Sequence, residues 1–171
     1  GDTRQTDITI AGTLAYRGGP NNSGVPRQLT WISAGGKSET LPFQPRAYND
    51  ASISPDGKRI AATVVDAGRL AIRILDLEHP TENAFALPGS NWYGTCHPEG
   101  KHLAFLCMRK GDFDVYWKDL TASGPDEPLL VTGFDELPET FLKDGSALVV
   151  RQSDAEGKYL PKLMPLKPIG A

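Results

Sequence analysis

Short apolar runs alternate with polar, glycine-containing turns along most of the chain. Three of these turns contain Gly57, Gly100 and Gly145, which stand 43 and 45 residues apart. Each glycine is followed by an apolar run of three or four residues, at 60–62, 103–105 and 147–150. Runs this short, rich in β-branched and aromatic residues, predict strands, and no stretch sustains apolar residues at helical spacing. The pattern therefore predicts hairpins repeated at a fixed interval.

The turns have a clear chemical basis. Residues 54–57 read Ser-Pro-Asp-Gly, 97–100 read His-Pro-Glu-Gly, and 142–145 read Leu-Lys-Asp-Gly. Proline fixes φ, an acidic side chain bonds to nearby backbone, and glycine accepts a positive φ. The strand from Tyr48 to Ser54 should then fold back onto the strand from Arg59 to Val65. Because the serine and the proline are lost in other repeats, the motif indicates a structural turn.

A period of about 40–45 residues with four strand-like segments is typical of a β-propeller blade. Gly12 stands 45 residues before Gly57 and extends the period towards the N-terminus. We therefore expect an all-β, propeller-type fold with about four blades of four antiparallel strands. The blades should span residues 7–43, 48–88, 91–132 and 136–166, within a single domain or propeller fragment at 1–171.

The repeat resembles that of the TolB family of WD-like β-propellers. The resemblance rests on Ser-Pro-Asp-Gly-Lys-x-Ile-Ala from residue 54 and on Ile-Leu-Asp-Leu at 74–77, and it extends over about 12–166. It implies a protein-binding scaffold of bacterial origin in a periplasmic or other extracytoplasmic location. Similar repeats occur in extracytoplasmic sensor regions of bacterial kinases and in the propellers of prolyl-oligopeptidase-like peptidases.

TolB has six blades and an additional α/β domain, whereas this chain contains four repeats. Four blades could close a small ring, or they could form an open arc. An open arc would expose apolar blade faces, and these favour association with another chain. We therefore expect an array that associates, as a homo-oligomer for example, and the alternative is a closed monomeric ring.

Composition narrows the range of partners. The net charge of −3 and the lack of a cluster of basic residues argue against nucleic acid. No apolar run approaches the roughly 18 residues of a membrane-spanning helix, so membrane insertion is not expected. The two cysteines, Cys96 and Cys107, should lie several residues apart along one hairpin, which is too far for a disulfide. We expect two buried thiols.

The chain lacks an obvious catalytic constellation. It contains no Gly-x-Ser-x-Gly nucleophile elbow, and Ser54 belongs to a structural turn. His97 and His102 flank one hairpin, but zinc needs three or four convergent ligands, and the neighbouring Cys96 should point to the opposite face. We expect His97 to hydrogen-bond within its turn. The sequence therefore predicts no enzyme, no catalytic residue, no metal site and no cofactor.

Three features of the sequence are candidate binding sites. Asp135 and Glu136 are an irregular acidic pair that could serve a ligand or calcium at the channel mouth. Residues 17–28 should form an enlarged loop, which is either a solvated surface loop or a loop that binds a ligand. Arg46, Tyr48, Asn49, Trp92 and Tyr93 begin two inner strands, where a partner could bind at the rim of the channel, although packing between blades is the alternative. Trp31 and Trp117 should be packing residues.

The sequence thus predicts a non-catalytic binding module for a protein partner. The alternatives are a hydrolase or lyase built on a propeller, and a sensor domain of a larger receptor or kinase. A set of polar residues that converges in the channel without recurring from blade to blade would favour the enzyme.

Overall fold

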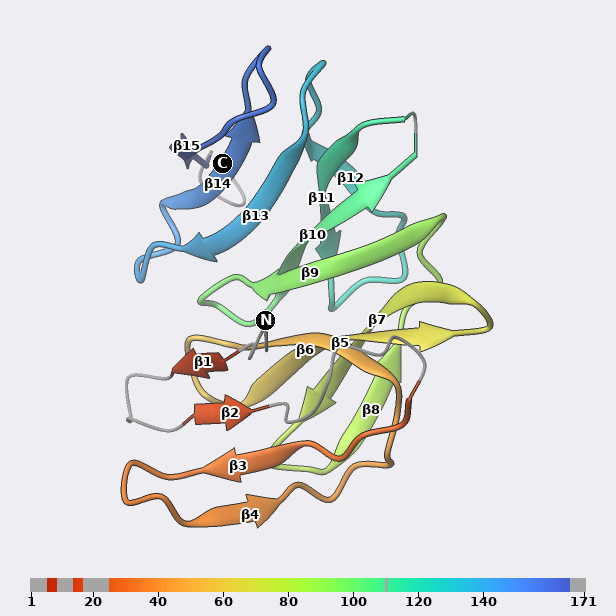
Figure 1. Ribbon diagram of the computed structural model, residues 1–171, viewed down its shortest axis with the longest axis vertical. Coiled ribbons are helices and arrows are strands. Elements are labelled where there is room, and N and C mark those ends of the chain that lie inside the picture. Colours follow the sequence, from red (N-terminus) through yellow and green to blue (C-terminus); the bar gives the residue numbers. More distant parts are fainter. Residues whose placement is uncertain (1–5, 9–13, 17–24, 110, 167–171) are drawn as a thin grey trace.

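The computed structural model describes residues 6–8, 14–16, 25–109 and 111–166, and its regular elements are all strands (Figure 1). Among these residues no helix has the length and apolarity needed to cross a membrane. The strands are β1 (Thr6–Ile8), β2 (Leu14–Tyr16), β3 (Thr30–Ile32), β4 (Ser38–Thr40), β5 (Tyr48–Ile53), β6 (Arg59–Asp66), β7 (Arg69–Asp76), β8 (Thr81–Ala84), β9 (Ser90–Cys96), β10 (His102–Met108), β11 (Phe113–Asp119), β12 (Glu127–Leu130), β13 (Glu136–Phe141), β14 (Ala147–Ser153) and β15 (Tyr159–Pro165).

The strands form four antiparallel sheets in chain order. The sheets are β1–β4, β5–β8, β9–β12 and β13–β15, so the described part of the fourth sheet has three strands. Within each sheet every strand pairs with its neighbour in sequence, as in a propeller blade. The predicted hairpin of the second repeat is confirmed, because β5 pairs with β6 from Tyr48 to Ile53. The all-β propeller architecture predicted from the repeat period is therefore present.

The repeated turns close in the same way in three sheets. The amide nitrogen of the turn glycine donates to the carbonyl three residues earlier, from Gly57 to Ser54 and from Gly100 to His97 at 2.8 Å, and from Gly145 to Leu142 at 2.9 Å. All three glycines have φ near +70°. This conformation is costly for a side chain with a Cβ atom, which explains why glycine persists while the flanking residues vary.

The core consists of three clusters, each between two consecutive sheets. The first joins Leu29 and Phe43 to Tyr48 and Ile60, and the second joins Ala61 and Ile72 of the second sheet to Phe105 of the third. The third joins Val115 to Leu148. Ile60 and Ala61 point to opposite clusters because successive strand residues face opposite sides of the sheet. Strand β6 is therefore buried on both faces along most of its length.

The sheets follow one another in an arc whose ends are the first and fourth sheets (Figure 1). The inner strands β5 and β13 both pack against β9. The pairing of each of these three inner strands is interrupted by a β-bulge, near Asn49, near Tyr93 and Gly94, and near Glu139. A bulge turns side chains away from the regular alternation. The inner strands can therefore present polar side chains to the space between the sheets.

The cysteine prediction is confirmed. Cys96 and Cys107 are free and buried, and they lie at opposite ends of the β9–β10 pairing. Burial raises the pKa of the Cys96 thiol to about 12. The thiol is therefore an apolar packing group at neutral pH and not a nucleophile.

Candidate functional site

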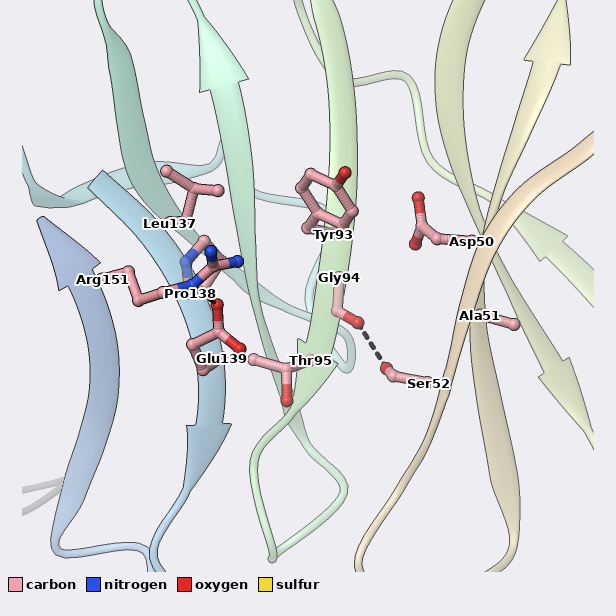
Figure 2. A pocket seen from close by; sticks show the side chains of 10 residues that line it. All are labelled: Asp50, Ala51, Ser52, Tyr93, Gly94, Thr95, Leu137, Pro138, Glu139 and Arg151. Carbon is pink, nitrogen blue, oxygen red and sulfur yellow. Dashed lines mark hydrogen bonds and ion pairs between the residues drawn. The ribbon is translucent and has the colours of Figure 1, made fainter. Parts of the chain in front are cut away.

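The inner strands enclose a groove of about 140 Å³, shown in Figure 2. Its walls come from the second, third and fourth sheets, whose inner strands pack side by side. The lining residues are Asp50, Ala51 and Ser52 of β5, Tyr93, Gly94 and Thr95 of β9, Leu137, Pro138 and Glu139 of β13, and Arg151 of β14. We call this space the inner-strand groove.

Tyr93 is the most unusual residue of the groove. Its φ is +51°, a left-handed conformation that residues with a Cβ atom rarely adopt, and it lies at the bulge of β9. The side chain remains exposed, and Figure 2 shows it facing Asp50 across the groove. Partial burial and the Asp50 carboxylate raise the pKa of the Tyr93 phenol. The hydroxyl is therefore a hydrogen-bond donor throughout the neutral range.

Polar groups dominate the remainder of the groove. Arg151 forms an ion pair with Glu139 on the neighbouring strand. The hydroxyl of Ser52 donates to the backbone carbonyl of Gly94, which ties β5 to β9 across the groove. Asp50 is a carboxylate that is only 3% exposed. The groove is thus lined by two carboxyl groups and one guanidinium.

These residues do not recur from sheet to sheet. Asp50, Tyr93 and Pro138 stand seven residues before the turn glycine of their own repeat, so three different residue types share one structural position. Arg151 stands where the other repeats carry Thr63 and Leu106. The groove lining therefore differs in chemistry from one sheet to the next.

Of the five residues predicted from the sequence, only Tyr93 lines the groove. Tyr48 is 3% exposed and belongs to the core between the first two sheets, which is the packing alternative. Arg46 forms a 2.9 Å ion pair with Glu82 of the outer strand β8. Asn49 is half-buried at the bulge of β5.

Trp92 is half-buried and packs edge-on against Phe113, with ring centroids 5.5 Å apart. Trp92 is thus a packing residue, whereas its neighbour Tyr93 lines the groove. Sequence reasoning missed Asp50, Glu139 and Arg151. The signal that could have found them is their departure from the residue types at equivalent positions.

The predicted acidic pair has structural contacts. The carboxylate of Asp135 accepts hydrogen bonds from the Phe113 amide at 3.1 Å and from the Tyr159 hydroxyl at 2.9 Å. Glu136 is fully buried and accepts a hydrogen bond from the Gln152 amide at 2.8 Å. Asp135 therefore links the third and fourth sheets, and Glu136 joins two strands of the fourth sheet. The predicted loop at 17–28 lies largely outside the described residues.

His97 makes the hydrogen bonds within its turn that the sequence predicted. Its Nδ1 accepts from the Glu99 amide at 3.3 Å, and its Nε2 is 3.2 Å from the carbonyl of Gly145 in the next sheet. His102 stacks on Trp117 with ring centroids 4.7 Å apart. Burial lowers the pKa of His102, so this ring is neutral at physiological pH. Trp117 is a packing residue, as predicted.

Comparison with solved structures identifies the architecture. TolB from Acinetobacter baumannii superposes with a TM-score of 0.67 over 96% of this chain and 44% of its own, at 18% identity. A putative TolB from Agrobacterium tumefaciens superposes with a TM-score of 0.71 over 96% of this chain and 61% of its own, at 19% identity. The fold is a TolB-like β-propeller. At this level of identity the likeness establishes the fold alone.

The structure of an enzyme is also similar to this chain. A gluconolactonase from Xanthomonas campestris has a TM-score of 0.60 over 94% of this chain and 61% of its own, at 14% identity. This chain therefore spans between 44% and 61% of the length of these three structures. No protein-family model matches the sequence, and comparison with curated proteins gives no sequence match.

Proposed function

We propose that the chain is a non-catalytic binding module that holds a protein partner at the inner-strand groove. The observation that carries this proposal is the convergence of Asp50, Tyr93, Glu139 and Arg151 at positions that do not recur among the blades. The TolB-like resemblance supports the same function and an extracytoplasmic location.

The groove has the features of a protein-binding site. Tyr93 offers an exposed ring and a hydroxyl donor, and tyrosine is among the residues that contribute most binding energy at interfaces. Its left-handed backbone is fixed by the pairing of β9 on both sides of the bulge. The side chain is therefore held in place before binding, which lowers the entropic cost of association. The carboxyl groups of the groove can accept hydrogen bonds from a partner segment that carries lysine or arginine.

A photo-crosslinking experiment tests the proposal. A photoreactive phenylalanine analogue placed at position 93 should form an adduct with a single partner in an extract of the producing organism. The same analogue at Phe134, an aromatic position of similar exposure outside the groove lining, is the matched control and should give no such adduct.

The identified partner then allows an affinity measurement. Tyr93→Ala should weaken binding by about 2 kcal/mol, which corresponds to roughly 30-fold, whereas Phe134→Ala should leave the affinity unchanged. Equal crosslinking at both positions, or equal affinity of both variants, would contradict a binding role for the groove.

An enzymatic function is the second candidate, and the same convergence of polar residues favours it. Asp50 and Glu139 would supply the carboxylates of a hydrolase or lyase, with Arg151 positioned for an anionic group. Turnover of a sugar lactone or glycoside by the wild-type chain, lost in both Asp50→Asn and Glu139→Gln, would support the enzyme over the binding module. Turnover that persists in both variants would show that the groove is not the active site.

A further inference from the structure

We propose that His97, Glu99 and His102 form a zinc site at the turn between β9 and β10. One ligand atom from each side chain lies within 4.8 Å of the other two. Two imidazoles and one carboxylate form a ligand set that zinc accepts readily. The cluster lies at the tip of the third sheet, and none of its members lines the inner-strand groove. The proposal is thus independent of the proposed function.

The equivalent turn of the second sheet shows what is unusual here. Ser54, Asp56 and Arg59 occupy the three corresponding positions. There the serine hydroxyl donates a hydrogen bond to the aspartate carboxylate at 2.5 Å and accepts one from the backbone amide of the arginine at 2.9 Å. In the third sheet all three positions carry residue types that ligate metals, and the side chains of His97 and Glu99 are 4.0 Å apart. The turn of the third sheet therefore holds its side chains farther apart than the hydrogen-bonded turn of the second sheet.

His97 is oriented as a metal ligand would be. Its Nε2 lies 3.2 Å from the Gly145 carbonyl, which can only accept, so this nitrogen carries the proton. The lone pair is consequently on Nδ1, on the side of Glu99. Histidines that bind metals commonly donate their other ring N–H to a backbone carbonyl in this way. The single hydrogen bond that Nδ1 accepts, from the Glu99 amide, is long at 3.3 Å.

His102 supplies the independent observation. The residue is 8% exposed, and its Nδ1 is buried without a hydrogen-bond partner among the described residues. A buried polar nitrogen without a partner costs free energy, and coordination of a zinc ion by this nitrogen would remove that cost. The ring is fixed by stacking on Trp117, so His102 is preorganised for binding.

Modest movement would complete the site. Zinc–ligand bonds of about 2.1 Å with tetrahedral angles separate the ligand atoms by about 3.4 Å. The Glu99 side chain is 55% exposed and can swing inward, whereas the two histidines are held by packing. Cys96 belongs to the core cluster on the other face of the sheet, and its thiol is not a ligand. Three protein ligands leave a fourth position for water or another donor.

Metal titration of the purified, EDTA-treated chain tests the site. Calorimetry with zinc should give one ion per chain, and cobalt should give the visible absorption bands of a tetrahedral site. Glu99→Gln and His102→Gln should each weaken zinc binding by at least about tenfold. Zinc should also raise the unfolding midpoint of the wild type, because it binds only the folded turn.

The third histidine provides the matched control. His79 is 84% exposed on the loop after β7, so His79→Ala should leave zinc binding unchanged. If His102→Gln fails to fold by circular dichroism, Glu99→Gln decides the outcome, because Glu99 is exposed. The proposal is overturned if the wild type binds no stoichiometric zinc. It is also overturned if Glu99→Gln binds as tightly as the wild type, or if His79→Ala abolishes binding.

Discussion

Tyr48, Asn91 and Glu136 stand nine residues before the turn glycine of three successive repeats, and all three are at most 3% exposed. One buried position thus holds a phenol, an amide and a carboxylate. Each finds a partner close by: the phenol and the amide donate to nearby backbone carbonyls, and the carboxylate accepts from a side-chain amide. The blade requires a buried polar residue to be satisfied at this position, not a particular side chain.

Tyr48 gives a prediction about pH. Burial, with the nearby Glu82 charge, raises the pKa of this phenol from 10.0 to about 12. Between these two pH values the unfolded chain loses the proton while the folded chain keeps it, so the free energy of unfolding falls as pH rises. Urea unfolding of the wild type at pH 9 and pH 12 should show a loss of stability that is about 1–2 kcal/mol smaller in Tyr48→Phe.

The comparison between variants isolates the phenol, because every other group that titrates in this range is common to both chains. Tyr48→Phe should also be about 1 kcal/mol less stable than the wild type at pH 7, since the hydrogen bond to the Gln44 carbonyl is lost. The same pH dependence in both chains would contradict the raised pKa.

At the scale of the element, β9 is the strand on which the centre of the arc depends. It packs against the second sheet on one side and against β13 on the other. Gly94 lies where β9 meets the second sheet, and a Cβ atom at this position would lie 3.3 Å from Ala61, Ile72 and Leu103. The close approach of the sheets therefore favours a residue without a side chain at this position.

Gly94→Ala should consequently destabilise the fold. The added methyl group meets three packed side chains, and overpacking of this kind costs about 1–3 kcal/mol. Gly124→Ala is the control, because nothing lies within 4 Å of a Cβ atom at that position. Chemical denaturation should show the loss for Gly94→Ala alone. Equal midpoints for both variants would show that the neighbouring sheets adjust without cost.

At the scale of the whole molecule, the fourth sheet is one end of the arc that the described residues form. Within the described residues β15 pairs on one side only, with β14. Leu160 and Leu163 of this strand are 39% and 57% exposed. An edge strand with exposed apolar side chains is a site for pairing with another chain. We propose that a second copy of the chain covers this edge.

Sedimentation of the purified chain tests this proposal. The wild type should sediment as a dimer or larger species at micromolar concentration, and Leu163→Lys should shift it towards the monomer, because a buried lysine opposes association. Lys162→Arg on the same strand should leave the mass unchanged. A wild type that remains strictly monomeric over the whole concentration range would contradict an associating edge.

The sequence by itself determined the number and kind of the sheets. Turn glycines need a positive φ, so they persist at a fixed interval, and the apolar runs behind Gly57, Gly100 and Gly145 must be strands buried on both faces. The buried thiols and the hydrogen-bonding role of His97 also followed from position along a hairpin. These properties depend on residues close together in the sequence.

Only the tertiary structure decided which side chains meet. Asp50, Tyr93 and Arg151 come from three different sheets, and they share one groove because the inner strands β5 and β13 both pack against β9. This packing joins residues far apart in the sequence, so the pattern along a single strand does not predict it. Trp92 packs against Phe113, whereas its neighbour Tyr93 lines the groove. The local pattern therefore specified the blades, and the way the blades pack specified the sites.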